Sequence, residues 1–202
     1  MSTWCILPVR SLAGSKSRLA GQLDAAERAA LTSRFVRRTI AVLQAVPAIE
    51  RILVVSRDPA VFALVASAGV VALSEGEPAG LNSAVGQAVA FLTARGAAQA
   101  LILPADLPFV SSADVEALLA AAGPGRLVIA PDERGDGTNA LLLSLPARLP
   151  FQYGEGSQAR HLAAAAALGL ATRQVQRPGL AFDLDTEADW RSYQRQLADP
   201  TG

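Results

Sequence analysis

Hydrophobic and polar positions along the chain fall into two alternating patterns. Short runs rich in Val, Ile and Leu predict β-strands, and longer stretches whose apolar residues recur every three or four positions predict α-helices. The predicted strands cover residues 4–9, 51–56, 70–74, 100–105, 126–131, 139–144, 171–176 and 180–185. The predicted helices cover residues 25–46, 59–68, 82–95, 112–122, 157–168 and 186–197.

This alternation predicts an α/β fold with three layers. Parallel strands need crossover connections, so strands separated by helices indicate a mostly parallel (mixed) sheet flanked by helices on both faces. The longest helix should begin after Asp24, whose carboxylate can cap it while Glu27 reaches back, and should end before Pro47. The length of 202 residues predicts a single domain over residues 1–202. In such sheets ligands bind beyond the carboxyl ends of the strands.

Composition narrows the classes of function. The chain is 51% hydrophobic and 18% charged, and it has no apolar run near the ~20 residues of a membrane span, so we expect a soluble protein without membrane contact. Its first residues lack the pattern of a signal peptide, which predicts a cytoplasmic location. Cys5 lies in an apolar run and is expected to be a buried, inert thiol. Eighteen basic and eighteen acidic residues, with no basic stripe, argue against a nucleic-acid partner; a homo-oligomer stays open.

The loop after the first strand, "PVRSLAGSKSRL", carries cations among small residues. Gly14 allows close approach of main-chain amides, and Lys16 and Arg18 could neutralise phosphates, so the loop is a candidate phosphate-binding loop. It is not a Walker A loop, which would need glycine in place of Arg10 and Ser15. The alternative is a solvated loop with ordinary surface cations.

Three aspartates follow or interrupt predicted strands. Asp106 ends the central apolar run in "LPADLPFV", while Asp183 and Asp185 in "FDLDTEADW" would share one face of the last predicted strand. Three carboxylates suit a Mg²⁺ ion that also holds substrate phosphates. The alternatives are a turn or helix cap at Asp106 and a cap of the last helix at Asp185.

Two glycine-containing segments, "GDGTNALLL" and "YGEGSQARHL", suggest a second anion site. The first precedes Thr138 and Asn139, and the second opens a helix at Ser157, whose amides and dipole favour an anion. The alternatives are a hairpin-like turn and an ordinary capped helix start. His161, the one histidine of the chain, lies one helical turn past Ser157. It is more typical of a structural role; in a functional one it would assist anion binding.

Taken in order, "LPVRSLAGSKSRL", "LPADLP", "APDERGDGTNALLL", "YGEGS" with the later histidine, and "PGLAFDLDT" resemble the 2-phospholactate guanylyltransferase family. These enzymes are also called the phosphoenolpyruvate guanylyltransferases of deazaflavin coenzyme F-420 biosynthesis. The resemblance spans nearly the whole chain. It implies a fold like that of molybdopterin guanylyltransferases and nucleotide-diphospho-sugar transferases, GTP as donor and Mg²⁺ as cofactor. It also implies a small phosphorylated acid as acceptor: phosphoenolpyruvate, 2-phospho-L-lactate or 3-phosphoglycerate.

The resemblance also implies roles for individual residues. By similarity, Asp106, Asp183 and Asp185 would hold the metal, and Thr138, Gly154 and Ser157 would bind the acceptor. Lys16 joins the aspartates as a catalytic candidate. The residues expected to contact GTP are Arg10, Gly14, Lys16, Arg18, Gly80, Leu81 and Asn82. Arg10 replaces a lysine expected in many relatives, which keeps the charge but changes the phosphate geometry.

Three other classes of function stay open at this point. The "DLD" sequence matches the Asp-x-Asp pattern of sugar-nucleotide glycosyltransferases, although that pattern is expected after a central strand, where this chain has "ADLP". A different cytidylyl- or guanylyltransferase of the molybdopterin type would share the aspartates. A non-catalytic GTP-binding protein would not need all three of them.

Overall fold

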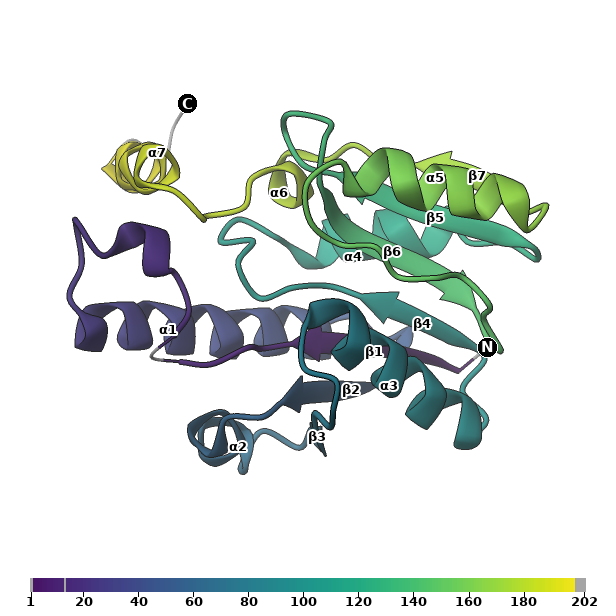
Figure 1. Ribbon diagram of the computed structural model, residues 1–202, viewed down its shortest axis with the longest axis horizontal. Helices are drawn as coiled ribbons and strands as arrows, with labels where there is room; N and C mark the ends of the chain where they lie inside the picture. The colour runs from purple at the N-terminus through teal and green to yellow at the C-terminus, as the bar shows by residue number, and fades with distance from the viewer. Residues whose placement is uncertain (1, 13, 199–202) are drawn as a thin grey trace.

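A seven-stranded mixed β-sheet forms the centre of the protein (Figure 1). The computed structural model describes residues 2–12 and 14–198. The strand order is β3-β2-β1-β4-β6-β5-β7. The strands are β1 (Thr3–Pro8), β2 (Ile49–Ser56), β3 (Val71–Ser74), β4 (Gln99–Ile102), β5 (Arg126–Pro131), β6 (Thr138–Ser144) and β7 (Ala171–Gln174). Neighbouring strands are parallel except that β6 runs antiparallel to both β4 and β5.

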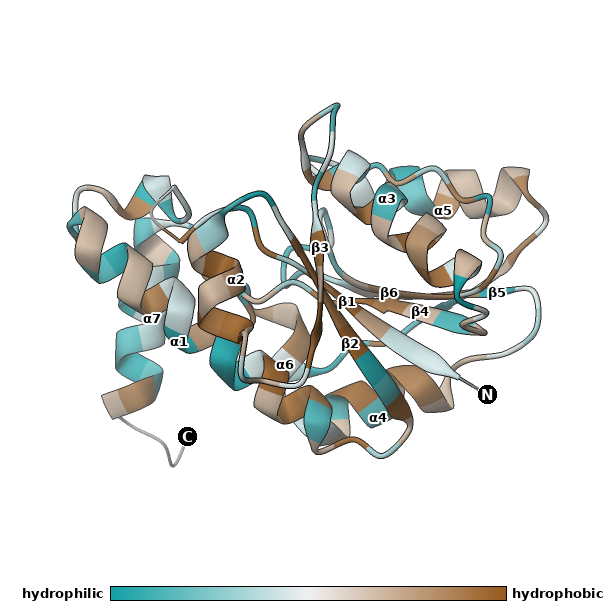
Figure 2. Ribbon diagram, turned by 90° about the horizontal axis from the view of Figure 1, so that it is seen from below, coloured by the Kyte–Doolittle hydropathy of each residue, from teal (hydrophilic) through white to brown (hydrophobic). Residues whose placement is uncertain are grey.

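Helices cover both faces of the sheet, which gives the predicted three layers (Figure 2). One face is covered by α1 (Ala25–Gln44), α2 (Pro59–Val65), α4 (Ser112–Ala120) and α6 (Pro178–Ala181), and the other by α3 (Leu81–Ala94) and α5 (Ser157–Ala167). The alternation of side chains along each strand supplies both cores. In β1, Cys5 and Leu7 pack on the first face, while Trp4 and Ile6 pack on the second.

A third apolar cluster lies apart from the two sheet faces and joins both ends of the chain. Its buried members are Leu19, Leu31, Phe35, Leu184 and Tyr193. Leu19 belongs to a short 3-10 helix, η1 (Ser17–Leu19), and Tyr193 belongs to the last helix, α7 (Glu187–Ala198). The cluster therefore holds the loop after β1 and the segment before α7 against α1.

The α/β prediction is confirmed, and so is the predicted start of α1. Oδ1 of Asp24 accepts from the N–H of Glu27 at 2.8 Å, and Oε2 of Glu27 accepts from the N–H of Asp24 at 2.8 Å. Several predicted ends differ by a few residues: α1 ends at Gln44, and α2 ends at Val65. No helix within residues 2–12 and 14–198 is long and apolar enough to cross a membrane.

The predicted strand over residues 180–185 is wrong. The short helix α6 occupies its start, and residues 182–185 belong to no strand. Leu184 makes one main-chain hydrogen bond to the loop after β4, from its N–H to the carbonyl oxygen of Asp106 at 3.0 Å. Its side chain is fully buried in the third apolar cluster. Packing against helices, rather than a strand ladder, therefore satisfies the alternating pattern that predicted a strand.

The reversed direction of β6 decides where the site lies. The register pairs Ile102, the last residue of β4, with Leu141 of β6. Thr138 therefore begins β6 at the same edge of the sheet where the chain leaves β4 toward Asp106.

Candidate active site

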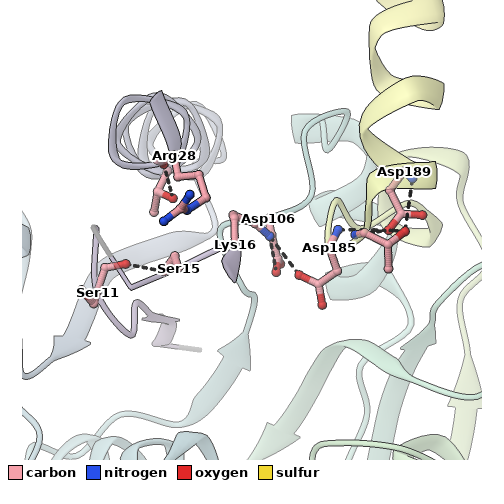
Figure 3. A network of polar contacts seen from close by, with 9 residues as sticks. Ser11, Ser15, Lys16, Arg28, Asp106, Asp185 and Asp189 are labelled. Carbon is pink, nitrogen blue, oxygen red and sulfur yellow. Dashed lines mark hydrogen bonds and ion pairs between the residues drawn. The ribbon is translucent and has the colours of Figure 1, made fainter. Parts of the chain in front are cut away.

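Lys16 lies at the centre of a polar network that joins distant parts of the chain (Figure 3). Its Nζ donates to Oδ2 of Asp106 at 3.1 Å and to Oδ1 of Asp185 at 3.1 Å. The lysine side chain is 6% exposed, so the two carboxylates, rather than solvent, surround the ammonium. Because both oxygens contact one nitrogen, Asp106 and Asp185 face the same small volume.

The loop after β1 folds back on itself and directs Lys16 inward. The N–H of Gly14 donates to Oγ of Ser11 at 3.1 Å, and the N–H of Leu12 donates to Oδ2 of Asp58 at 2.9 Å. Lys16 has φ 57° and ψ 34°, and it is the one non-glycine residue with positive φ in the described part of the chain. Such a conformation costs free energy and persists where surrounding contacts enforce it.

Asp106 and Asp185 stabilise the positive charge of Lys16. Burial lowers the pKa of the ammonium, but the charges of Asp106 and Asp185 and their hydrogen bonds raise it, and the net pKa is raised. Lys16 is therefore protonated at physiological pH. It neutralises part of the negative charge of these two aspartates.

Asp183 is the third predicted aspartate, and the main-chain bond from Leu184 to Asp106 brings it to the same place. Among the described residues, no Lys or Arg forms an ion pair with its carboxylate. Burial and then the charges of Asp106 and Asp185 raise the pKa of Asp183 to about 6. The structure thus assembles the three aspartates into a cluster that favours an added cation.

The alternative interpretation of Asp185 as the cap of α7 is wrong. Oγ1 of Thr186 accepts from the N–H of Asp189 at 3.3 Å, and Oδ2 of Asp189 accepts from the N–H of Thr186 at 2.7 Å. Thr186 and Asp189 thus form the reciprocal cap themselves. The carboxylate of Asp185 is left to face Lys16 (Figure 3).

Side chains from two other elements hold α6, the helix that leads into the acidic segment. Nδ2 of Asn139, on β6, donates to two carbonyl oxygens of α6 at 2.9 and 3.1 Å. Nε of Arg177 donates to Oδ1 of Asp114, a buried residue of α4, at 3.0 Å. A Cβ on Gly179 would overlap Oδ2 of Asp114, so only glycine fits there. Ser111 and Asp114 form the reciprocal cap of α4. The further contact of Asp114 with the segment that leads to Asp183 joins residues far apart in the chain and has no local signal in the sequence.

Thr138, Ser157 and His161 form a buried network on the other side of β6. Oγ1 of Thr138 lies 3.0 Å from Nδ1 of His161, and Oγ of Ser157 donates to Oγ1 of Thr138 at 3.2 Å. The N–H of Gln152 donates to Nε2 of His161 at 3.0 Å. Burial, and then the charge of Arg160, lower the pKa of His161 to about 4, so the ring is neutral at pH 7.

A cleft of about 720 Å³ brings most of the predicted residues together. The predicted residues that line it are Arg18, Leu81, Asp106, Thr138, Gly154, Ser157, Asp183 and Asp185. Lys16 contacts two of these. Arg10, Gly14, Gly80 and Asn82 are not among the lining residues.

Two of the residues predicted to contact GTP have structural contacts of their own. Oδ1 of Asn82 accepts from the N–H of Tyr153 at 2.7 Å, and Nδ2 donates to the carbonyl oxygen of Tyr153 at 3.3 Å. Gly80 precedes α3 with φ 129°, and its N–H donates to Oε1 of Glu75 at 2.7 Å. Asn82 thereby ties α3 to the loop before Gly154, while a contact with GTP stays a prediction.

Residues 3–192 match the model of a protein family described as guanylyl transferase, CofC like. The chain belongs to this family. It is 45% identical over 190 residues to a phosphoenolpyruvate guanylyltransferase of Rubrobacter xylanophilus, with 94% of this chain and 92% of the relative covered. It is 38% identical over 189 residues to a 3-phospho-D-glycerate guanylyltransferase of Phenylobacterium zucineum, with 91% and 86% covered.

The fold agrees with this family. A Desulfovibrio desulfuricans G20 protein described as a nucleotide-diphospho-sugar transferase superimposes with a TM-score of 0.80 at 15% identity, over 100% of this chain and 90% of the other. The similarity shows a shared fold. Family membership makes the chain a nucleotidyltransferase enzyme, which sets aside the glycosyltransferase and the non-catalytic alternatives.

Acidic residues outnumber basic ones along the cleft of this guanylyltransferase. The acidic lining residues are Asp106, Asp132, Glu133, Asp136, Glu155, Asp183, Asp185 and Asp189, and the basic ones are Arg18 and Arg134. Enzymes of this class generally use a divalent metal ion, which lets polyanionic substrates enter such a cleft. Within the described residues, no group of three or more acidic, histidine or cysteine side chains is arranged to hold a metal ion, so joint coordination of one ion by Asp106, Asp183 and Asp185 stays a prediction. The donor set instead fits a metal held by one or two carboxylates and completed by substrate phosphates.

Proposed function

We propose that the protein transfers GMP from GTP to the phosphate of a small phosphorylated carboxylic acid and releases pyrophosphate, as a step of coenzyme F-420 biosynthesis. One observation carries this proposal: a single cleft is lined both by the aspartate cluster and by neutral hydroxyl and main-chain donors. The first set suits a triphosphate with a metal ion, and the second suits an anionic acceptor. Family membership supports guanylyl as the transferred group.

The acceptor that we propose first is phosphoenolpyruvate, the substrate in the name of the 45%-identical Rubrobacter relative. The hydroxyl of Thr138 and the main chain at Gly154 would contact its carboxylate and phosphate, and Ser157, whose hydroxyl donates to Thr138, would orient that hydroxyl. The backbone of Gly154 has φ 118°, which side chains rarely tolerate, and its exposed amide can approach a ligand closely. Ser157 opens α5, whose N-terminal dipole favours negative charge.

Mg²⁺ is the metal that we propose, because carboxylate and phosphate oxygens are its preferred ligands. One or two of the carboxylates of Asp106, Asp183 and Asp185 would hold it, together with phosphate oxygens of GTP. When bound, it would neutralise phosphate charge and favour departure of pyrophosphate. Lys16 and Arg18 would supply further positive charge toward the phosphates of GTP.

The reaction that we propose requires alignment more than proton transfer. A phosphate oxygen of the acceptor attacks the α-phosphorus of GTP, and the bond to the pyrophosphate oxygen breaks. The attacking oxygen is already anionic, so no general base is needed. The neutral and fully hydrogen-bonded state of His161 agrees with this, because both ring nitrogens are engaged away from any proton transfer.

Release of pyrophosphate from GTP, Mg²⁺ and phosphoenolpyruvate tests the proposal directly. The same assay with 3-phosphoglycerate or 2-phospho-L-lactate in place of phosphoenolpyruvate measures acceptor selectivity. With ATP in place of GTP it measures base selectivity. A guanylylated product and stoichiometric pyrophosphate are expected. Absence of turnover with all three acceptors, from protein shown to be folded, would exclude the proposed reaction. GTP and phosphorylated acids are small metabolites of the cytoplasm, so we place the reaction there.

A further inference from the structure

The hydrogen bonds of His161 define which of its ring nitrogens carries the proton. Its Nε2 faces the main-chain N–H of Gln152 at 3.0 Å. A backbone N–H can only donate, so Nε2 must accept. The ring is neutral, with its pKa lowered to about 4, and its one proton must therefore be on Nδ1. Nδ1–H then donates to Oγ1 of Thr138.

This assignment fixes the polarity of the Thr138 hydroxyl. A hydroxyl oxygen has two lone pairs and one proton. Oγ1 of Thr138 accepts one hydrogen bond from His161 at 3.0 Å and a second from Ser157 at 3.2 Å. With both lone pairs used, the hydroxyl can offer a ligand only its proton. Thr138 lines the cleft, so that proton is the group available there.

We propose that His161 is a positioning residue of the acceptor site: its neutral Nδ1–H tautomer makes the hydroxyl of Thr138 an obligatory donor, which selects an anionic group of the acceptor. This inference rests on the proposed function. His161 itself is 0% exposed and acts through Thr138. The main-chain N–H of Gln152 sets the tautomer.

The opposite tautomer shows why the arrangement matters. A proton on Nε2 would face the N–H of Gln152, donor against donor. Nδ1 would then accept from Thr138, and the hydroxyl would present a lone pair to the anion instead of a proton. The acceptor would meet repulsion where it now meets a hydrogen bond.

Nitrogen NMR on protein labelled with ¹⁵N-histidine tests the tautomer without any substrate. His161 is the one histidine of the chain, so the spectrum contains one pair of ring nitrogens. We expect the proton on Nδ1 at pH 7. A proton on Nε2, or on both nitrogens, would overturn the inference whatever the enzyme assay gives.

Two variants of His161 test the effect on the acceptor. The amide of asparagine reaches the place of Nδ1 and can still donate to Thr138, whereas the amide of glutamine reaches the place of Nε2. We expect His161→Gln to raise the acceptor KM about 10-fold or more, with the KM for GTP unchanged, and His161→Asn to stay within about 3-fold of the wild type. A merely structural role would raise neither KM selectively.

A double variant completes the test. Thr138→Val removes the hydroxyl, so adding His161→Gln to it should raise the acceptor KM no further. Equal acceptor KM values for the Asn and Gln variants, or additive effects in the double variant, would overturn the inference. If the variants do not fold, the wild-type nitrogen spectrum decides alone. Wild-type protein without any transfer would refute the proposed function instead, while the spectrum would still report the tautomer.

Discussion

Replacing Gly179 with alanine should destabilise the protein and slow transfer, although Gly179 does not line the cleft. The new Cβ would overlap Oδ2 of Asp114 and would lie 3.0 Å from its Cγ and 2.8 Å from the carbonyl oxygen of Phe109. The carbonyl belongs to the main chain, so it cannot rotate away as the end of a flexible side chain could. Helix α6 must therefore move outward, and the segment that carries Asp183 follows it.

The contacts around Gly179 set the size of the effect. Overpacking of a buried site costs about 1–3 kcal/mol. A shift of Asp114 also weakens its bonds to the N–H and hydroxyl of Ser111, at 3.0 and 2.7 Å, which cap α4. Loss of such a cap costs about 1 kcal/mol. We expect the free energy of unfolding to fall by about 2–4 kcal/mol and Tm to fall by about 5–15 °C.

Urea unfolding and steady-state kinetics would measure both effects. Displacement of Asp183 should lower kcat at least about 10-fold at a temperature where the variant stays folded. Gly86→Ala is the matched control, because it lies inside α3 and a Cβ there meets nothing within 4 Å. That change should raise the free energy of unfolding by up to about 1 kcal/mol. If the two variants had the same stability and the same kcat, the role assigned to the α6 anchor would be refuted.

Three further predictions concern charged groups. Asp183→Asn should abolish transfer. It should leave the free energy of unfolding in metal-free buffer unchanged or about 1 kcal/mol higher, because it relieves carboxylate repulsion. The control Glu116→Gln, at an exposed position of α4, should change neither the transfer rate nor the free energy of unfolding. Calorimetry and the pyrophosphate assay check this, and an active but destabilised Asp183→Asn protein would contradict it. Lys16→Ala should lower GTP affinity or turnover about 10- to 100-fold with little change in the acceptor KM, and a rise confined to the acceptor KM would assign the loop to the other substrate. The protonation of His161 should by itself cost the folded protein up to about 3 kcal/mol of stability as pH falls from 6.5 to about 4, because the unfolded ring takes up a proton in this range while the folded ring stays neutral; Asp183, with its pKa raised to about 6, opposes this loss, so the His161 part is the difference between wild type and His161→Asn. Denaturation curves of His161→Asn should lose that part of the pH dependence, and parallel curves for the two proteins would refute it.

The sequence predicted those features that depend on neighbours in the chain. Apolar runs located β1 to β7, and the Asp24 and Glu27 pair predicted the cap that α1 has. The strand prediction around Leu184 was wrong for a physical reason. An alternating pattern shows that every second side chain is buried, but it does not show whether strands or helices cover those side chains. Leu184 packs between η1, α1 and α7, and the first two of these lie at the opposite end of the chain.

The arrangement of the site depended on contacts over long distances in sequence. The loop after β1 was predicted to face phosphates, yet Lys16 pairs with aspartates 90 and 169 residues away. No spacing rule links such partners. In the same way, the helical pattern placed His161 one turn from Ser157, but its contact with Thr138 required the first residue of β6 to lie beside α5.

The antiparallel strand β6 separates the two groups of predicted site residues along the chain. Because β6 enters the sheet at the edge where β4 leaves it, every residue assigned to the acceptor falls in one continuous stretch, 138–161, whereas Asp106, Lys16 and the last acidic segment come from outside it. A chimera could therefore exchange this stretch with that of the 38%-identical 3-phospho-D-glycerate guanylyltransferase, with Asn139 and Tyr153 kept because they contact α6 and Asn82. Under the proposed assignment, the antiparallel strand gathers the residues that select the acceptor into a single segment of the chain.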